Sequence, residues 1–119
     1  MQEIRGFNDL DKFIIENSNS KNVLMLYFGA AWCGPCKQLK ARLADSDTYQ
    51  IMPELVIAHI DVDEDENEKL IKRYEINSLP TQIFIKLENN NVVKVASILG
   101  YDFTKLKLEY DNYHVIKPT

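Results

Sequence analysis

The chain has 119 residues, of which 45% are hydrophobic and 27% charged, with a formal net charge of −4. This length and composition predict one compact globular domain, spanning residues 1–119. The acidic balance disfavours nucleic acid or an anionic membrane as a partner. The longest apolar run, at residues 23–28, is too short to cross a bilayer. The N-terminus has no basic segment followed by an apolar stretch, so we expect no secretory signal and a cytoplasmic location.

The spacing of apolar residues predicts the helices and strands in chain order. A continuous apolar run is typical of a strand buried on both faces, whereas a recurrence at three or four residues indicates a helix. The expected elements are a short strand near residues 3–5, a helix at 10–17, a strand at 23–29, a helix from the cysteines to about residue 46, a strand at 55–62, a helix at 66–74, strands at 81–87 and 92–99, and a helix at 103–113.

Caps and turns support this order. Asn8 or Asp9 can cap the first helix. The segment 89–91 is Asn-Asn-Asn, and asparagine tolerates the left-handed conformation of tight turns, so the last two strands should form a hairpin that ends at Gly100. Helices between the early strands imply parallel crossovers, and the hairpin implies a mixed sheet. The expected fold class is therefore α/β, with a central mixed β-sheet flanked by helices.

The stretch AAWCGPC contains both cysteines of the chain, Cys33 and Cys36. A structural disulfide there would close a four-residue loop and contribute only about 2 kcal/mol. A zinc site would need further ligands, and His59 and His114 do not follow finger spacing, so we expect no metal. Two inert buried thiols would not explain the Gly-Pro pair between them.

A redox role explains more of this stretch. A strand should end at Gly29 and a helix should begin near Cys33, so the first thiol lies at a helix N-terminus, where free N–H groups and the helix dipole favour thiolate. Pro35 suits a first helical turn. Cys36 lies one turn further on the same face, so Cys33 can attack a disulfide and Cys36 can resolve the mixed disulfide.

The residues WCGPCK resemble the active-site motif of the thioredoxin family at every position. The segment Leu79-Pro80-Thr81 is similar to the cis-proline segment that this family places against its dithiol, and Gly100 is similar to a glycine before the last helix. The likeness extends over nearly the whole chain. It implies a thioredoxin fold with helices on both faces of the sheet. It also implies a thiol–disulfide oxidoreductase that reduces protein disulfides and uses no cofactor beyond the redox-active disulfide Cys33–Cys36.

The resemblance also assigns roles to single residues and to partners. Cys33 would be the nucleophile and Cys36 the resolving thiol. The expected substrate-binding residues are Trp32, Gly34, Pro35, Leu79, Pro80 and Thr81, although Trp32 could instead be a core aromatic residue. Protein disulfides are the implied substrates, a thioredoxin reductase is the implied electron donor in cell redox homeostasis, and we expect a monomer.

The chain departs from the family pattern around this motif. Tyr27 stands where the family carries a buried Asp that accepts the proton of the resolving thiol, and tyrosine, with its usual pKa near 10, is a poor base at neutral pH. His59 matches a family lysine if a two-residue insertion follows at 61–69. We interpret it either as a structural strand histidine or as a proton-handling group. Ala41 replaces a helix-kinking proline, and Gly29 an aromatic residue.

Other interpretations stay open. The acidic stretch 61–68 begins like a calcium-binding EF-hand loop, but Glu66 and Lys72 occupy positions that require Gly and Glu, so we expect a solvated turn. Tyr27 favours, as an alternative to the reductase, a non-enzymatic binding or chaperone-like module with weak redox activity. An oxidant or isomerase outside the cytosol is a third option, although Gly-Pro between the cysteines resembles the reducing branch of the family.

Overall fold

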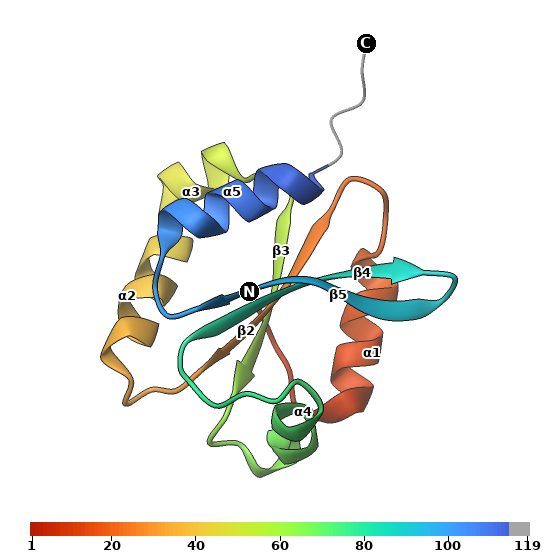
Figure 1. The fold of residues 1–119 in the computed structure, drawn as a ribbon, viewed down its shortest axis with the longest axis vertical. Helices are drawn as coiled ribbons and strands as arrows, with labels where there is room; N and C mark the ends of the chain where they lie inside the picture. The colour runs from red at the N-terminus through yellow and green to blue at the C-terminus, as the bar shows by residue number, and fades with distance from the viewer. Residues whose placement is uncertain (115–119) are drawn as a thin grey trace.

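A computed structural model describes residues 1–114 as a five-stranded sheet with helices on both faces (Figure 1). The final five residues of the expected domain, 115–119, lie outside the described residues. In chain order the elements are β1 (Gln2–Glu3), α1 (Gly6–Asn17), β2 (Val23–Gly29), α2 (Gly34–Leu43), α3 (Ser46–Ile51), β3 (Leu55–Asp61), a 3-10 turn η1 (Asp65–Asn67), α4 (Glu68–Arg73), β4 (Thr81–Glu88), β5 (Asn91–Leu99) and α5 (Phe103–Tyr113).

The sheet is mixed, as the sequence predicts, with the strand order β1-β3-β2-β4-β5. β3 pairs with both β1 and β2 in parallel, whereas β4 is antiparallel to β2 and β5. Asn89 and Asn90 have φ values of 51° and 66°, which confirms the expected asparagine turn between β4 and β5. All seven residues of β2 are buried, because this central strand is covered on both faces.

Alternate residues of β2 face two separate hydrophobic clusters. Leu24, Leu26 and Phe28 pack with buried residues of α1 and α4, whereas Val23, Met25 and Tyr27 pack with buried residues of α2 and α5. Figure 1 shows the corresponding layers, with α1 and α4 on one side of the sheet and α2 and α5 on the other. Tyr27 therefore lies on the face that α2 covers.

The start of the first helix differs from the expectation. The helix begins at Gly6 and its N-cap is Arg5, so Asn8 and Asp9 lie inside the helix and neither is the cap. Asp9 Oδ2 still stabilises the helix start, because it accepts a hydrogen bond of 2.8 Å from Arg5 N. Gly6 N donates to Asn67 Oδ1 at 2.8 Å, a contact between residues distant in sequence that no local pattern could indicate.

The helix after the cysteines is also shorter than expected. α2 ends at Leu43, and the chain becomes extended at Asp45 before a separate helix, α3, begins at Ser46. Thr48 is buried there, and its hydroxyl donates to Arg42 O. A buried polar contact thus accompanies the break that we did not predict.

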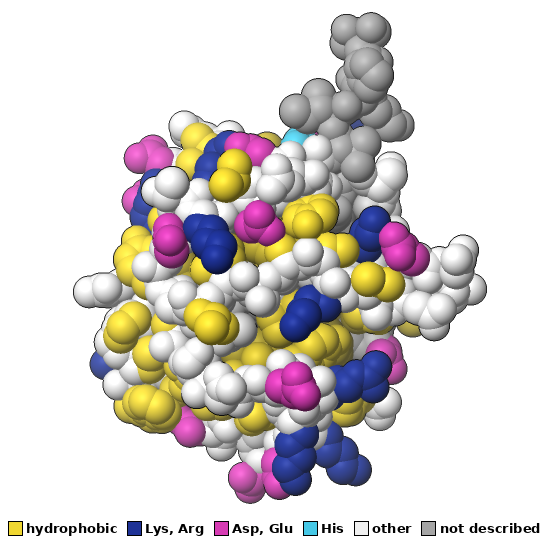
Figure 2. Space-filling model, in the orientation of Figure 1, with side chains coloured by type: hydrophobic (Ala, Val, Ile, Leu, Met, Phe, Trp, Pro, Cys, Tyr) yellow, Lys and Arg dark blue, Asp and Glu magenta, His cyan; other side chains and the backbone are white. Residues whose placement is uncertain are grey.

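The outer surface on the face drawn in Figure 2 carries hydrophobic side chains among charged ones of both signs. Large hydrophobic residues that are exposed include Ile15, Trp32, Tyr49, Leu99 and Leu108. No helix within residues 1–114 has the length and apolar character needed to cross a membrane.

Candidate active site

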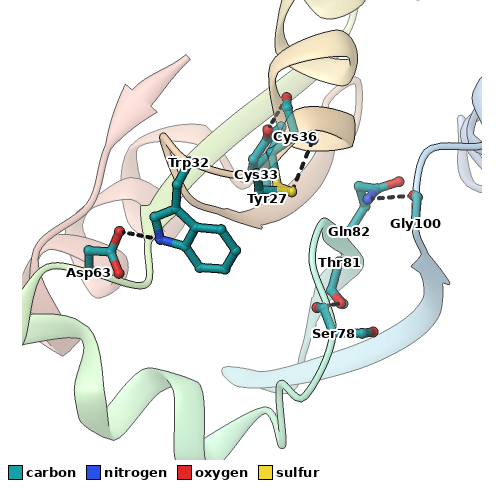
Figure 3. Close-up of a disulfide and its surroundings, with 9 residues drawn as sticks. All are labelled: Tyr27, Trp32, Cys33, Cys36, Asp63, Ser78, Thr81, Gln82 and Gly100. Carbon is teal, nitrogen blue, oxygen red and sulfur yellow. Dashed lines mark hydrogen bonds between the residues drawn. A yellow bond between two sulfur atoms is a disulfide. The ribbon is translucent and has the colours of Figure 1, made fainter.

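Cys33 and Cys36 form a disulfide at the start of α2 (Figure 3). Cys33 is the N-cap residue of this helix, and its Sγ accepts a hydrogen bond of 3.2 Å from Cys36 N. Cys33 is 7% exposed and Cys36 is 2% exposed. Cys33 is thus the more exposed of the two, although the surrounding chain covers most of both residues in this oxidised state.

An apolar groove of about 410 Å³ lies in front of Cys33. Its lining comes from the residues just before α2, the residue after β3, α4 and the segment before β4, and includes Trp32, Val62, Ile71, Ile76 and Leu79. Trp32 is 68% exposed, so it is not a core aromatic residue. Trp32 Nε1 donates a hydrogen bond of 2.9 Å to Asp63 Oδ2, and this bond fixes the indole at the rim (Figure 3).

The segment before β4 forms the opposite wall of this groove. The Leu79–Pro80 peptide bond is cis, as the sequence predicts. Pro80 O accepts a hydrogen bond of 2.7 Å from Gly100 N, and Gly100 adopts φ = 83°, which favours glycine. Thr81 is buried, and its hydroxyl donates to Ser78 O at 2.7 Å, so this side chain holds the segment together and does not face the groove.

Gly34 and Pro35 occupy the first turn of α2, next to the disulfide, and both are exposed. A Cβ added at Gly34 would meet no atom within 4 Å. The space around Gly34 is therefore open, next to the disulfide.

Tyr27 lies behind the disulfide. Its hydroxyl donates a hydrogen bond of 2.7 Å to Cys36 O, and its side chain is buried. Burial raises the pKa of Tyr27 to about 12, so the phenol stays protonated at neutral pH. Tyr27 is therefore a hydrogen-bond donor here and has no capacity to accept a proton from a thiol.

Gly29 explains how this large residue fits. A Cβ at position 29 would overlap the Tyr27 ring, with the nearest contact at Cε1. The tyrosine ring thus occupies the space next to Gly29 that a side chain would need. The two departures from the family pattern in β2 therefore depend on each other, because the ring of Tyr27 fits only while position 29 has no side chain.

His59 lies on the same face of the sheet as Tyr27. The two residues are register partners in β3 and β2, and their rings meet edge-to-face at 5.1 Å between centroids. His59 Nδ1 lies 2.7 and 2.8 Å from the two carboxylate oxygens of Glu3. His59, Glu3, Tyr27 and Cys36 all line one pocket of about 390 Å³ behind the disulfide. His59 and Cys36 therefore line the same pocket.

Glu3 is a residue of this pocket that sequence reasoning missed. It lies in β1, where Glu3 pairs in register with His59 of β3. The sequence indicated a short strand near residues 3–5, but it did not indicate that this strand pairs with β3 and so places Glu3 beside His59.

The acidic stretch 61–68 forms a structural turn. Asp61 Oδ1 accepts a hydrogen bond of 2.9 Å from Asp63 N, and the buried Asn67 side chain donates to Ile4 O and Asp61 O. Within the described part of the chain, no cluster of three or more His, Cys, Asp or Glu side chains could hold a metal ion. Asp63, whose side chain holds Trp32, is a further residue that the sequence did not single out.

Comparisons with known proteins agree with this geometry. The sequence model of the thioredoxin family matches residues 8–107. Thioredoxin-1 of Drosophila melanogaster is 35% identical over 106 residues, which cover 89% of this chain and 91% of the relative. Thioredoxin of Chlamydia pneumoniae is 31% identical over 103 residues, covering 87% and 91%. The X-ray structure of Fasciola hepatica thioredoxin superposes with a TM-score of 0.77 at 29% identity, covering 95% of this chain and 99% of that one.

Proposed function

Because the chain belongs to the thioredoxin family of thiol–disulfide oxidoreductases, we propose that it reduces the disulfides of other proteins, with Cys33 as nucleophile and Cys36 as resolving thiol. The observation that supports these roles is the position of the two sulfurs relative to the groove. Cys33 caps α2 and lines the apolar groove, whereas Cys36 lies one turn behind it and lines the rear pocket. A substrate in the groove would meet Cys33 first.

The reaction proceeds in two exchanges. The Cys33 thiolate attacks one sulfur of the substrate disulfide, and the other substrate sulfur leaves as a thiolate. The Cys36 thiolate then attacks Cys33 Sγ, which breaks the bond to the substrate and forms the Cys33–Cys36 disulfide. Two electrons pass from the dithiol to the substrate, which gains two thiols. The free N–H groups at the start of α2 stabilise negative charge on Cys33 Sγ. One of them, Cys36 N, already donates a hydrogen bond to this sulfur.

The groove suits an extended peptide segment that carries the disulfide. Trp32 and Leu79 offer apolar surface on its two sides, and the exposed Gly34 and Pro35 leave space beside the attacked sulfur. The backbone around Leu79 precedes β4 and can pair with a substrate strand. Pro80 and Thr81 shape this wall from inside, because both are buried.

Continued turnover requires a source of electrons for Cys33–Cys36. A thioredoxin reductase is the partner that the family likeness favours, and the reducing cytoplasm is the compartment in which such a dithiol would work as a reductant. These assignments, and a monomeric state, are part of the proposal.

Insulin reduction, with dithiothreitol or a thioredoxin reductase as electron donor, tests the proposed function. The wild-type chain should accelerate precipitation of the insulin B chain, and Cys33→Ser should reduce the rate to the uncatalysed background. If the wild-type chain gives no acceleration with either donor, the proposal is wrong and a non-enzymatic binding module is favoured. A measured dithiol potential more oxidising than that of glutathione would instead favour an oxidant or isomerase.

A further inference from the structure

The pocket behind Cys36 contains groups that can take up or attract charge. They come from every element that surrounds it: Glu3 of β1, Tyr27 of β2, Lys37 and Lys40 of α2, and His59 and Asp61 of β3. Tyr27 is protonated and donates to Cys36 O, and the two lysines are cationic donors with no acceptor site. The pocket therefore has three groups that can accept a proton, namely the imidazole of His59 and the carboxylates of Glu3 and Asp61.

Glu3 determines which nitrogen of His59 is free to act. Both carboxylate oxygens lie within 2.8 Å of Nδ1, so Nδ1 carries a proton and donates it toward Glu3. In the neutral imidazole the other nitrogen, Nε2, is then an unprotonated base. The side chain of His59 is only 12% exposed, and its ring packs edge-to-face with the Tyr27 ring, so the imidazole is held in place within the pocket wall.

Asp61 is less suited to this role than His59. Its Oδ1 already accepts the hydrogen bond from Asp63 N that closes the turn after β3. The carboxylate of Glu3 is largely exposed and already accepts the hydrogen bond from His59 Nδ1. An imidazole is also the ordinary side chain whose charge changes near neutral pH.

We propose that Glu3 and His59 form a proton-accepting pair for Cys36. The inference rests on the proposed function, and it concerns only the second exchange. The proton of the Cys36 thiol passes across the rear pocket to His59 Nε2. The Cys36 thiolate attacks Cys33 Sγ, the Cys33–Cys36 bond forms, and the substrate sulfur leaves with the electron pair of the broken bond. His59 then returns its proton to solvent. Glu3 is a positioning residue that fixes the tautomer of His59.

Single-turnover kinetics with a symmetrical nitrothiobenzoate disulfide tests this pair. Attack by Cys33 releases one coloured thiolate, and resolution by Cys36 releases the second, so the two exchanges give separate phases. We expect His59→Gln to slow the second phase at pH 7 by roughly 10- to 100-fold, near the lower end of what a general base supplies. We expect Glu3→Gln to slow it by roughly 3- to 10-fold through loss of the fixed tautomer. The first phase should be unchanged in both variants.

Two further variants serve as controls. His114→Gln replaces the other histidine of the chain, which contacts Glu54 at the far end of α5, and it should leave both phases unchanged. Asp61→Asn removes the competing carboxylate from the pocket. If Asp61→Asn, and not His59→Gln, slows the second phase, the pair proposed here is wrong. If the wild-type chain shows no first phase, the proposed function itself fails, so the two failures are distinguishable.

The pH profile separates proton transfer from a structural effect. In the wild-type chain the second-phase rate should level off with rising pH once the imidazole has lost its proton, a loss that nuclear magnetic resonance follows independently. In His59→Gln the rate should keep rising with pH, because the Cys36 proton then passes only to solvent. A His59→Gln variant that resolves at the wild-type rate between about pH 6 and 8 would overturn the proposal.

The tautomer can be measured without any change in the pocket. In the His114→Gln background only one imidazole remains, and its two-bond nitrogen–proton correlations report which nitrogen is protonated. The proposal requires a protonated Nδ1 and an unprotonated Nε2 at neutral to mildly alkaline pH. The opposite tautomer would overturn it, even if the His59→Gln variant failed to fold.

Discussion

The two sides of the Cys33–Cys36 disulfide differ in chemistry. The front is an apolar groove with Trp32 and Leu79, open to a partner, and the rear is a pocket with Glu3, His59 and other titratable side chains. Trp32 and Cys33 of the family motif line the front, whereas Tyr27 and His59, which depart from the family pattern, line the rear together with Cys36. This division suggests that docking of a substrate depends on the front, whereas handling of the Cys36 proton and local packing depend on the rear.

The largest expected effect distinguishes the two sulfurs. Cys33→Ser should abolish disulfide reduction, because no thiolate then faces the groove. Cys36→Ser should still allow the first attack, and it should accumulate a mixed disulfide with the substrate, detectable by non-reducing electrophoresis and mass spectrometry. Accumulation of the mixed disulfide in Cys33→Ser instead of Cys36→Ser would reverse the assignment of front and rear thiols.

The second effect concerns alkaline pH at the rear. Burial raises the pKa of Tyr27 to about 12, whereas an unfolded chain would ionise this tyrosine from about pH 10. Because the folded state holds the proton more tightly, the stability contribution is complete below pH 10 and is lost as the pH rises toward 12. The linkage predicts a loss on the order of 2–3 kcal/mol in the free energy of unfolding from this group.

Tyr27→Phe tests this linkage by urea unfolding at several pH values. At neutral pH the variant should be less stable by about 1 kcal/mol, since Cys36 O loses the hydroxyl donor. Between about pH 10 and 12 it should lose less stability than the wild-type chain. Tyr49→Phe is the matched control, because Tyr49 is exposed. Equal alkaline slopes for Tyr27→Phe and wild type would contradict the assignment.

The third effect concerns the packing of Gly29 against Tyr27. Gly29→Ala would force the new methyl group into the tyrosine ring, which the hydroxyl bond to Cys36 O holds in place. We expect the free energy of unfolding to fall by about 1–3 kcal/mol, as for other overpacked cores.

Gly34→Ala provides the comparison from the front of the site. A Cβ there meets no atom within 4 Å, so its effect on stability should stay within about 0.5 kcal/mol. Thermal or urea unfolding of the two variants measures the difference. A loss in Gly29→Ala no larger than that in Gly34→Ala would show that the rear of the site relaxes freely around the added methyl group.

The sequence predicted the sheet well because its signals are local. The continuous apolar run of β2, the hairpin asparagines and the helix start at Cys33 each depend on a few neighbouring residues. The missed features depend on polar contacts. α1 begins at Gly6, whose N–H bonds to the distant Asn67, and α3 separates from α2 around a buried Thr48, whose hydroxyl donates to Arg42 O. The spacing of apolar residues does not encode such polar contacts.

The site divides in the same way. The front could be predicted because Trp32, Cys33, Cys36 and the cis-proline segment belong to recognisable motifs. Tyr27 and His59 could be flagged as departures, but their environment could not be deduced. Glu3 reaches His59 only through the parallel register of β1 and β3, which joins residues 56 positions apart. The link between Gly29 and Tyr27 could not be predicted either, because it depends on where the tyrosine ring lies relative to position 29.

The smallest expected effect concerns the rim of the front groove. Asp63→Ala removes the acceptor of the Trp32 Nε1 hydrogen bond, an exposed contact that contributes about 1 kcal/mol or less. The indole should then sample other orientations, so we expect KM for insulin to rise by roughly 2- to 5-fold with kcat nearly unchanged. Trp32 is the only tryptophan of the chain, so its fluorescence spectrum and anisotropy report the freed indole directly. Asp111→Ala, on α5, makes the same change in net charge far along the chain and should alter neither KM nor the Trp32 fluorescence.

The comparison of front and rear also requires that Asp63→Ala leave the second kinetic phase unchanged. A slower second phase in this variant would show that the two sides of the disulfide are coupled through the turn that Asp61 and Asp63 share, whereas freed fluorescence with an unchanged KM would mean that substrates do not contact Trp32.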